Sequence, residues 1–441
     1  LISSFAKKLT DSLLSGAETV KLRMEKCRGI GLDGARVMSG EKSGVSARVR
    51  QQFPLVTYVH CFCHRLNLVL GESCKVKQIT LCLGTINSIY NFLNSPKKQV
   101  EFGKSIEKTT TETAKRKLKN TCETRWVERH EAVNTFFELL EPTIDVLSVI
   151  AGWSNSDNAM KAQSFLNTVL TFDFIISLVT LKLVFAFTLP LSRLLQSPSI
   201  DYSTAILSAN DIIEKLETIK QNRKENFENL FKEASVVASR FEIDISLPKN
   251  RGRPRLDGMN QQPEEFYLSF LFTPLLNSIN RELKEKFREN SVLSSFKNLM
   301  FNPDWLFRDE VQDSLKHLFH FYAGDLNGSL QMFFGEVEMW QKRLRNSTEK
   351  PQTAMDHLKT CPQEMFPNVF TLLKIYNVIP VTTADVERSF SQMKQLKTDD
   401  RNTTGEERLN GLMFLSIHRD IKVLFEEFID ELRKGKRRLD V

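Results

Sequence analysis

Cysteine is scarce and irregularly placed in this chain. The 441 residues include seven cysteines, an odd number without regular spacing. A disulfide framework pairs an even number of cysteines at regular intervals, so the sequence gives no sign of one. The pattern indicates a reducing compartment.

The sequence also lacks a leader segment. It begins with Leu1 rather than methionine, and no basic stretch followed by an apolar one opens it. We therefore expect the start to be a cut or an incomplete gene prediction rather than a natural terminus.

One long hydrophobic run occurs, at residues 172–191. Asp173 and Lys182 interrupt it, and Pro190 ends it. A single run of this kind is typical of a buried helix in a large α domain, so we expect no membrane role.

No charge of one sign is in large excess, because the net charge is only +7. A balance this modest permits a polyanionic partner without requiring one. The basic residues are, however, clustered at 115–119, 249–255 and 433–438. Such runs are often only solvated surface, but three of them in one chain favour a nucleic-acid partner.

The first 73 residues have the pattern of an α/β unit. Apolar spacing predicts a helix over 3–25, and a short apolar run predicts a strand that leads to Asp33. Residues 39–53 then favour a short helix with Ser39 as its N-cap. From 57 the pattern is β-rich and becomes helical from about His64.

From residue 74 to about 370 the pattern is helical, and no convincing strand occurs. The break at 243–262 is rich in proline, glycine and arginine and predicts an exposed loop between two helices of one domain. The predicted helical stretches are 75–95, 128–150, 158–196, 203–242, 264–288, 305–320 and 326–345.

After Pro380 the pattern predicts two amphipathic helices, at 381–397 and 406–421, joined by a polar loop. They carry more apolar residues than a lone terminal pair can bury, so they should pack on the core or on another subunit. The apolar residues are Val386, Phe390, Met393 and Leu396 in the first helix and Leu409, Leu412, Met413 and Ile417 in the second.

Asp33 can be read in two ways. An aspartate beside glycine is commonly a turn residue, because its carboxylate accepts hydrogen bonds from nearby backbone amides. The alternative is one ligand of a metal site whose other ligands lie elsewhere. The stretch "HCFCH" at 60–64 has zinc-binding residue types, but its spacing is too tight for a four-ligand site.

Two stretches favour contact with DNA. Arg125 and Trp126 stand at the head of a helical stretch, where the indole either packs in the core or stacks on an unpaired base. The stretch "RGRPR" at 251–255 resembles an AT-hook core. Its glycine allows close approach to a narrow groove, and its arginines suit the A·T-rich minor groove.

Several motifs together resemble the hAT-superfamily transposases and the host proteins derived from them. The resemblance is to the branch with zinc-finger MYM-type and THAP-type relatives. The motifs are "CRGIGLDGARVMSGEKSGVSARV", "HCFCHRLNLVL", "TRWVERHEAV" and "IPVTTADVERSFSQMKQLKTDDRNTTGEERLNGLMFLSI". The last resembles the C-terminal dimerisation region of the family and is the most specific.

The resemblance implies a ribonuclease-H-like α/β core interrupted by a large all-α insertion. It implies an active site of three carboxylates that hold two Mg²⁺ or Mn²⁺ ions for attack on a DNA phosphodiester. Asp33 falls on the second carboxylate and Glu387 on the third. Cys61 and His64 fall on the CxxH motif beside the site, and Arg125 with Trp126 falls on the Arg-Trp motif.

The first carboxylate of the family lies on a strand well before the second, and this chain begins only 32 residues before Asp33. Asp11 lies in a predicted helix and is no substitute. We therefore expect no independent catalysis and no bound metal for this chain alone. The alternatives are a fragment of an active transposase and a regulatory protein that acts through protein contacts without touching DNA.

The resulting prediction is a mostly helical, nuclear protein that binds DNA and itself. Its minor-groove contacts would be Arg251, Arg253 and Arg255. Its dimer contacts would be Val386, Phe390, Leu409, Leu412 and Met413. The predicted domains are a partial α/β core at 1–73, an all-α insertion at 74–370, a dimerisation region that completes the core at 371–425 and a basic tail at 426–441.

Overall fold

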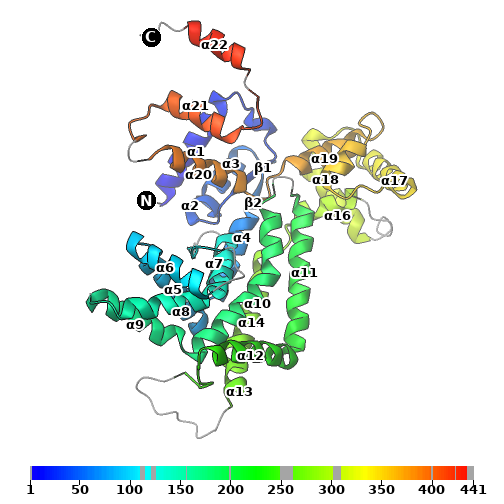
Figure 1. The fold of residues 1–441 in the computed structure, drawn as a ribbon. Coiled ribbons are helices and arrows are strands. Elements are labelled where there is room, and N and C mark those ends of the chain that lie inside the picture. Colours follow the sequence, from blue (N-terminus) through cyan, green and yellow to red (C-terminus); the bar gives the residue numbers. More distant parts are fainter. Residues whose placement is uncertain are drawn as a thin grey trace. The chain divides into compact units, whose positions relative to one another are not determined.

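The computed structural model describes residues 2–109, 115–120, 126–154, 156–197, 200–248, 262–300, 309–398, 401–422 and 424–434. The chain divides into two compact units, Leu1–Thr382 and Thr383–Val441. Helices dominate both units, and the described residues contain two short strands (Figure 1). The prediction of a mostly helical protein is confirmed.

The first unit opens with a small α/β layer. Strands β1 (Gly29–Leu32) and β2 (Thr57–His60) pair in parallel, with Leu32 opposite His60. Parallel neighbours need a crossover, and α2 (Arg36–Ser39) and α3 (Val45–Gln52) supply it. Helix α1 (Ile2–Thr19) packs against both, and a 3₁₀ turn, η1 (Met24–Lys26), leads into β1. The predicted strand–helix–strand–helix order is present, whereas a ribonuclease-H-like core stays a prediction.

The short helix predicted over 39–53 is present, but it starts later than predicted and Ser39 is not its N-cap. Ser39 ends α2, and α3 begins only at Val45, with Gly44 at its N-cap position. The Ser39 hydroxyl donates backwards, to the carbonyl of Gly34 at 3.0 Å and to that of Ala35 at 3.2 Å. It therefore stabilises the end of one helix rather than the start of the next.

The two faces of β1 pack against different parts of the first unit. Ile30 and Leu32 contact the small core beneath α1 and α3. Gly29 and Gly31 lie on the other face, against Pro380; a Cβ at Gly29 would be 2.8 Å from the Pro380 Cδ. Because side chains alternate along a strand, glycine at every second position lets residues 379–381 cross the sheet closely.

A large helical body follows the α/β layer (Figure 1). Its first helix, α4, packs against α14, so the body is anchored directly on the end of β2. A π-helical segment, η2 (Leu268–Phe272), joins α13 to α14. The helices are α4 (Phe62–Ser73), α5 (Lys77–Leu93), α6 (Pro96–Thr109), α7 (Trp126–Glu138), α8 (Leu140–Ala151), α9 (Ser156–Val169), α10 (Phe172–Leu195), α11 (Tyr202–Gln221), α12 (Arg223–Arg240), α13 (Pro263–Tyr267) and α14 (Thr273–Lys286).

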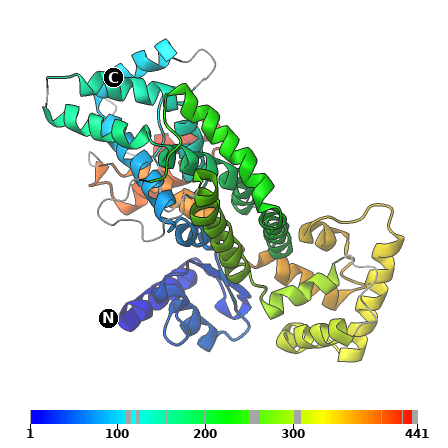
Figure 2. The same cartoon turned by 90° about the horizontal axis from the view of Figure 1, so that it is seen from below.

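The remaining helices of the first unit are those coloured yellow-green to light orange in Figure 2, and the side chain of Trp340 in this part is buried. Its indole N–H donates to the Leu299 carbonyl at 2.7 Å. The last of these helices, α19, leads the chain back to β1. The elements are α15 (Ser291–Ser295), η3 (Phe296–Leu299), α16 (Asp309–Phe321), η4 (Ala323–Asp325), α17 (Leu330–Asn346), α18 (Ala354–Thr360) and α19 (Pro367–Val378).

Helix α10 is the element that the long hydrophobic run forms. By length and composition it is the one helix in the described residues that could cross a membrane. It packs instead against α5, α7, α11 and α12, and most of its side chains are buried. The prediction of a buried core helix agrees with this packing.

Three of the long predicted helices are each two helices. The stretch 128–150 divides into α7 and α8, 158–196 into α9 and α10, and 203–242 into α11 and α12. At the second break the Thr171 hydroxyl accepts a hydrogen bond from the Phe174 N–H and caps α10. Such breaks lack proline, so apolar periodicity alone runs across them.

The second unit contains α20 (Ala384–Leu396), α21 (Glu406–Ile417) and α22 (Phe425–Lys434). Helices α20 and α21 pack together, and the Ser416 hydroxyl donates to the Gln392 side chain at 3.0 Å. The two amphipathic helices predicted after Pro380 are confirmed. The domain limits predicted from the sequence stay predictions.

Candidate functional site

Asp33 directly follows β1 at the carboxyl end of the two strands. Its side chain is exposed, and its Oδ1 accepts a hydrogen bond from the Ala35 N–H at 3.0 Å. The Tyr58 hydroxyl donates to the Asp33 carbonyl at 3.2 Å. This is the geometry of an aspartate that stabilises a turn. The carboxylate nevertheless lies at the carboxyl ends of parallel strands, where α/β proteins commonly bind their ligands.

His60 ends β2 and contacts the turn that holds Asp33. Its ring lies so close to Gly34 that a Cβ there would be 2.4 Å from the His60 Cε1. The His60 Nε2 is buried and has no hydrogen-bond partner among the described residues. Burial, helped by the positive charges of Arg65 and His64, lowers the pKa of His60 to about 4. The ring is therefore neutral at pH 7.

Cys61 and His64 lie at the start of α4, beside the same edge. The Cys61 N–H donates to the Leu32 carbonyl at 2.9 Å, which places Cys61 next to the turn at Asp33. The Cys61 side chain is fully buried. The His64 ring centroid lies 5.4 Å from that of His60. The structure thus brings the predicted residues Asp33, Cys61 and His64 to one end of the sheet.

Thr382, the last residue of the first unit, reaches this edge from the far end of the sequence. The Phe62 N–H donates to the Val381 carbonyl at 3.0 Å. The Thr382 hydroxyl lies 3.2 Å from the Cys63 Sγ and 3.8 Å from the Cys61 Sγ. The sequence analysis identified neither Thr382 nor His60 as a residue of this edge. The position of His60 in the 60–64 stretch was the one available signal, and Thr382 had none.

The residues at this edge do not make a complete metal site. The described residues include no group of three or more histidine, cysteine, aspartate or glutamate side chains that could hold a metal ion. Asp33 is the only carboxylate among the residues just described. No chemistry that depends on a bound metal is assigned to these residues.

Glu387, the predicted third carboxylate, lies in the first turn of α20 in the second unit. Its side chain is exposed, and its Oε1 accepts a hydrogen bond from the Thr383 hydroxyl at 3.0 Å. Its N–H donates to the Thr383 carbonyl at 3.0 Å. A carboxylate in this position is favoured by the helix dipole. The joint metal-binding role of Asp33 and Glu387 stays a prediction.

Most of the predicted DNA contacts lie outside the described residues. Arg125 is one of them, and so are Arg251, Arg253 and Arg255. Helix α7 begins at Trp126, as the predicted head of a helix requires, but the structure does not describe its side chain.

The basic run at 115–119 is partly neutralised by α7. Lys115 forms an ion pair with Glu138 at 2.7 Å, and Lys119 forms one with Glu131. Leu118 is buried and anchors the run on the protein. These pairs favour a structural role for the two lysines, which weakens this run as a nucleic-acid contact.

The predicted dimer contacts lie on α20 and α21, and they are poorly buried. Val386 is 53% and Phe390 61% exposed, whereas Leu409, Leu412 and Met413 are half-buried. In the described part of this unit, Ala384 is the one buried residue. Further apolar side chains that are at least 37% exposed are Met393, Phe414, Leu415, Ile417, Ile421, Leu424, Phe425 and Phe428.

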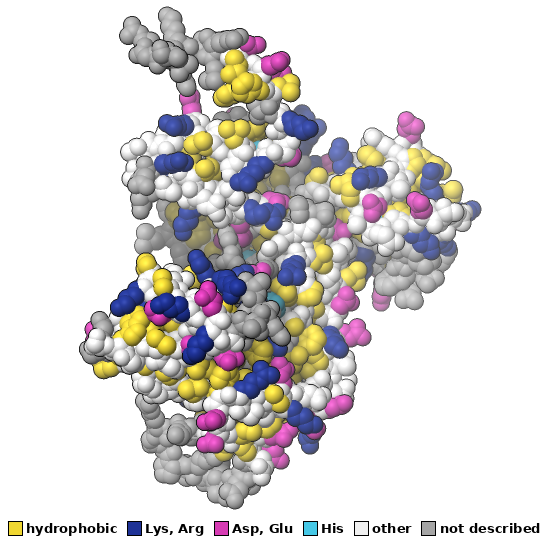
Figure 3. Space-filling model, viewed as in Figure 1, with side chains coloured by type: hydrophobic (Ala, Val, Ile, Leu, Met, Phe, Trp, Pro, Cys, Tyr) yellow, Lys and Arg dark blue, Asp and Glu magenta, His cyan; other side chains and the backbone are white. Residues whose placement is uncertain are grey.

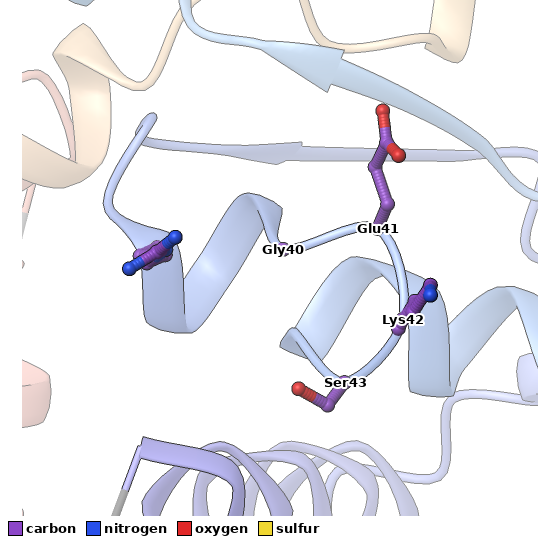
Figure 4. A pocket seen from close by; sticks show the side chains of 5 residues that line it. Gly40, Glu41, Lys42 and Ser43 are labelled. Atoms are coloured by element: carbon purple, nitrogen blue, oxygen red, sulfur yellow. The ribbon is translucent and has the colours of Figure 1, made fainter.

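A shallow pocket lies between α2 and α3, lined by Arg36 and by residues 40–43. Figure 4 shows that the side chains of Glu41, Lys42 and Ser43 point away from one another. They do not converge on a common point, so the pocket does not suggest a binding site.

Comparison with known proteins identifies part of the chain. Residues 330–421 match the model of the hAT family C-terminal dimerisation region. The match covers α17, α18, α19, α20 and α21 and confirms the resemblance to this family. It starts before residue 371, where the sequence prediction placed this region.

Curated relatives extend the similarity over most of the chain. The chain is 28% identical over 425 residues to the mouse 52 kDa repressor of the inhibitor of the protein kinase. It is 29% identical over 421 residues to the human protein of the same name. Each alignment covers 93% of this chain but only 55% of the relative. The chain therefore spans about half the length of the curated relatives it matches.

Proposed function

Because the chain carries a hAT-family C-terminal dimerisation region, we propose that it is a transposase-derived protein that self-associates and binds DNA without cutting it. The observation that carries the proposal is the exposed apolar surface of α20 and α21. The match to the dimerisation region supports a second copy of the chain as the cover for that surface.

The described part of the second unit lacks a buried core of its own. Removing apolar surface from water contributes roughly 25 cal/mol per Å². Ala384 is the one buried residue in the described part of this unit. A helix pair that exposes side chains such as Phe390 and Phe414 gains little free energy from its own packing. A symmetric contact between two copies would bury these side chains on both subunits.

Sedimentation of the purified chain tests self-association. We expect a dimer for the wild type and a shift towards monomer for Leu412→Asp, because a carboxylate would then be buried in the contact. Leu207→Asp on α11 is the matched control, since Leu207 is 63% exposed in the first unit. A Leu412→Asp protein that sediments as the wild-type dimer would show that the contact lies elsewhere.

DNA binding is proposed for the arginines of residues 251–255. The ion pairs of Lys115 and Lys119 favour this segment over the 115–119 run. We expect fluorescence anisotropy to show binding to A·T-rich duplex DNA that weakens as salt rises, because phosphate contacts release counterions. A DNA partner would also favour a nuclear location.

Charge-matched variants separate a specific contact from net charge. We expect Arg251→Ala, Arg253→Ala and Arg255→Ala together to weaken A·T-rich binding strongly. The control replaces the exposed Lys7, Lys8 and Lys26 by alanine and loses the same charge. Absence of binding at low salt would rule out the DNA partner and favour the second candidate, a regulatory protein that acts through protein contacts. The mouse and human relatives are named as repressors, which favours that candidate too.

The proposal that the chain does not cut DNA concerns its carboxylates. Asp33 lies at the sheet edge where Thr382 ends the first unit, and Glu387 follows Thr382 by five residues. Two carboxylates leave the three-carboxylate set of the family incomplete, so we expect no strand cleavage in Mg²⁺ or Mn²⁺. Cleavage that Asp33→Asn abolishes would favour an active transposase instead.

A further inference from the structure

The matched dimerisation region begins at residue 330, so its first helix is α17 (Leu330–Asn346), which belongs to the first unit. The proposed contact of α20 and α21 uses only helices of the second unit. Figure 3 shows apolar side chains at the surface of the part that α17, α18 and α19 occupy, at the right of the view. The first part of the match therefore has an exposed surface of its own.

The inner face of α17 is occupied by contacts within the chain. Phe333, Val337 and Trp340 are buried on this face. Beside them the Glu336 carboxylate accepts hydrogen bonds from the N–H of Asn368 at 2.9 Å and from its side-chain amide at 2.6 Å. These contacts fix α17 against the start of α19, and they leave its outer face uncovered.

The outer face of α17 carries methionines around a glycine. Met332, Gly335 and Met339 share this face by helical spacing. Met332 is 63% and Met339 47% exposed. Next along the face, the Arg343 Nη1 lies 3.9 Å from the Sδ of Met365, which is itself 53% exposed. Methionine is enriched in protein interfaces, and its flexible side chain adapts to the partner it meets.

Gly335 leaves room on this face for a close neighbour. It is exposed, and no atom lies within 4 Å of the position that a Cβ would take. Glycine within a helix is less favourable than alanine, and no packing contact of the described residues requires it here. Between two exposed methionines, it allows a second helix to approach α17 closely.

We propose that α17 packs in antiparallel orientation against α17 of a second copy of the chain, with the two Gly335 residues at the crossing point. Around a two-fold axis at this point, Met332 of one copy lies beside Met339 of the other, so the face is complementary to itself. A parallel pair would bring the exposed basic residues Lys342 and Arg343 of both copies together, whereas the antiparallel pair separates them.

The other exposed charges of α17 do not oppose this contact. Glu338 and Arg345 lie roughly a quarter of a turn or more from the centre of the methionine face. The partner is a second copy because the family's dimerisation region begins with this helix. The contact rests on the proposed self-association and adds to it a surface of the first unit. A crossing of two single helices buries too little area to hold two chains alone, so α17 reinforces the contact of α20 and α21.

Gly335→Gln in the full chain tests the close approach. The monomer should stay folded, because glutamine suits a helix better than glycine and the space at this position is open. A two-fold contact receives the added side chain twice, and we expect sedimentation to show self-association weakened on the order of tenfold. Gly71→Gln in α4 is the matched control, since Gly71 is also exposed with open space around it. A Gly335→Gln protein that dimerises as the wild type does would overturn the α17 pair.

Cross-linking between introduced cysteines tests the orientation. One version of the full chain carries Met332→Cys, and a second version, tagged to differ in size, carries Met339→Cys. After mixing, a short thiol-reactive cross-linker should join the two versions to each other more than either to itself, and the wild type gives the background from native cysteines. Cross-links mainly within each version would indicate a parallel pair and overturn the proposal, as would none above background.

The two proposals can fail separately. A wild type that stays monomeric would overturn both the α17 pair and the proposed self-association. A wild-type dimer that Leu412→Asp weakens and Gly335→Gln does not would overturn the α17 pair alone.

Discussion

Gly34 and His60 restrict each other at the carboxyl end of the two strands. The His60 ring occupies the space that any side chain at position 34 would need. The contact fixes the turn that carries Asp33, and it buries an imidazole without a charged partner. The environment of one histidine therefore affects both the position of the candidate carboxylate and the pH dependence of stability.

Gly34→Ala should destabilise the protein by about 1–3 kcal/mol, because overpacking forces neighbouring groups to move. A Cβ at this position would lie 2.4 Å from the His60 Cε1. Gly71→Ala in α4 is the control, since no atom lies within 4 Å of its Cβ position and alanine is favoured in helices. Urea unfolding measures both. Equal stability of the two variants would contradict the close contact.

His60 should make the protein less stable as the pH falls. Its pKa is lowered from 6.5 to about 4 in the fold, so between these values the unfolded chain binds the proton more tightly. Above pH 6.5 the histidine is neutral in both states and does not lower the free energy of unfolding. Between pH 6.5 and pH 4 the free energy of unfolding falls, because only the unfolded chain binds the proton readily. Buried His130 and His357 also have lowered pKa values, so the effect of His60 must be measured as a difference.

The measurement compares unfolding free energies at pH 7 and pH 5. The wild type should lose more stability between these values than His60→Gln, in which this proton cannot bind. His317→Gln, at an exposed position of α16, should keep the dependence of the wild type. An unchanged dependence in His60→Gln would mean that the imidazole is not buried as described.

Among the elements, η4 forms an ion pair through Asp325 with Arg28, the residue that precedes β1. The Arg28 guanidinium donates from Nε and Nη2 to the two carboxylate oxygens of Asp325, at 2.6 and 2.5 Å. The two side chains are only 11% and 19% exposed. The hydrogen bonds to Asp325 raise the pKa of Arg28. Beside the pair, the Thr57 and Tyr322 hydroxyl oxygens lie 3.3 Å apart. The segment that follows α16 is thus joined to the α/β layer through polar contacts.

Asp325→Asn should cost about 1–3 kcal/mol of stability, because it leaves a mostly buried guanidinium without its counter-charge. Asp313→Asn is the control. It removes an ion pair with Lys316 whose side chains are 73% and 45% exposed, and we expect a change within about 0.5 kcal/mol. Equal effects of the two substitutions in chemical denaturation would contradict a structural role for the Arg28 pair.

At the scale of the whole molecule, the two units differ in how much they bury. The first unit contains the large apolar core that includes α10 and Trp340. The described part of the second has three helices and one buried residue. Local stability follows buried apolar contact, so the second unit should depend on its partner.

Amide hydrogen exchange at two protein concentrations tests this dependence. Protection of α20, α21 and α22 should increase with concentration, because dimer formation covers them. Protection of α10 should stay the same, since its cover lies within the first unit. Equal protection of α20–α22 at both concentrations would indicate a cover within the same chain.

Where local pattern governs, the sequence predicted the structure well. Apolar spacing identified α20 and α21, and the order of apolar runs and turns identified β1 and β2. The motif at 379–417 also identified the dimerisation region. The apolar pattern could not predict the breaks between α7 and α8 or between α11 and α12, because helical spacing continues across both.

By itself the sequence determined the helical class, the α/β start and the family resemblance, because these depend on residues within one or two turns of each other. Only the tertiary structure placed His60 against Gly34, brought Thr382 beside Cys61 and paired Lys115 with Glu138. These contacts join residues that are distant in sequence, and their energy comes from packing and charge that no local pattern records. The same physics leaves the apolar faces of α20, α21 and α22 exposed in a single chain.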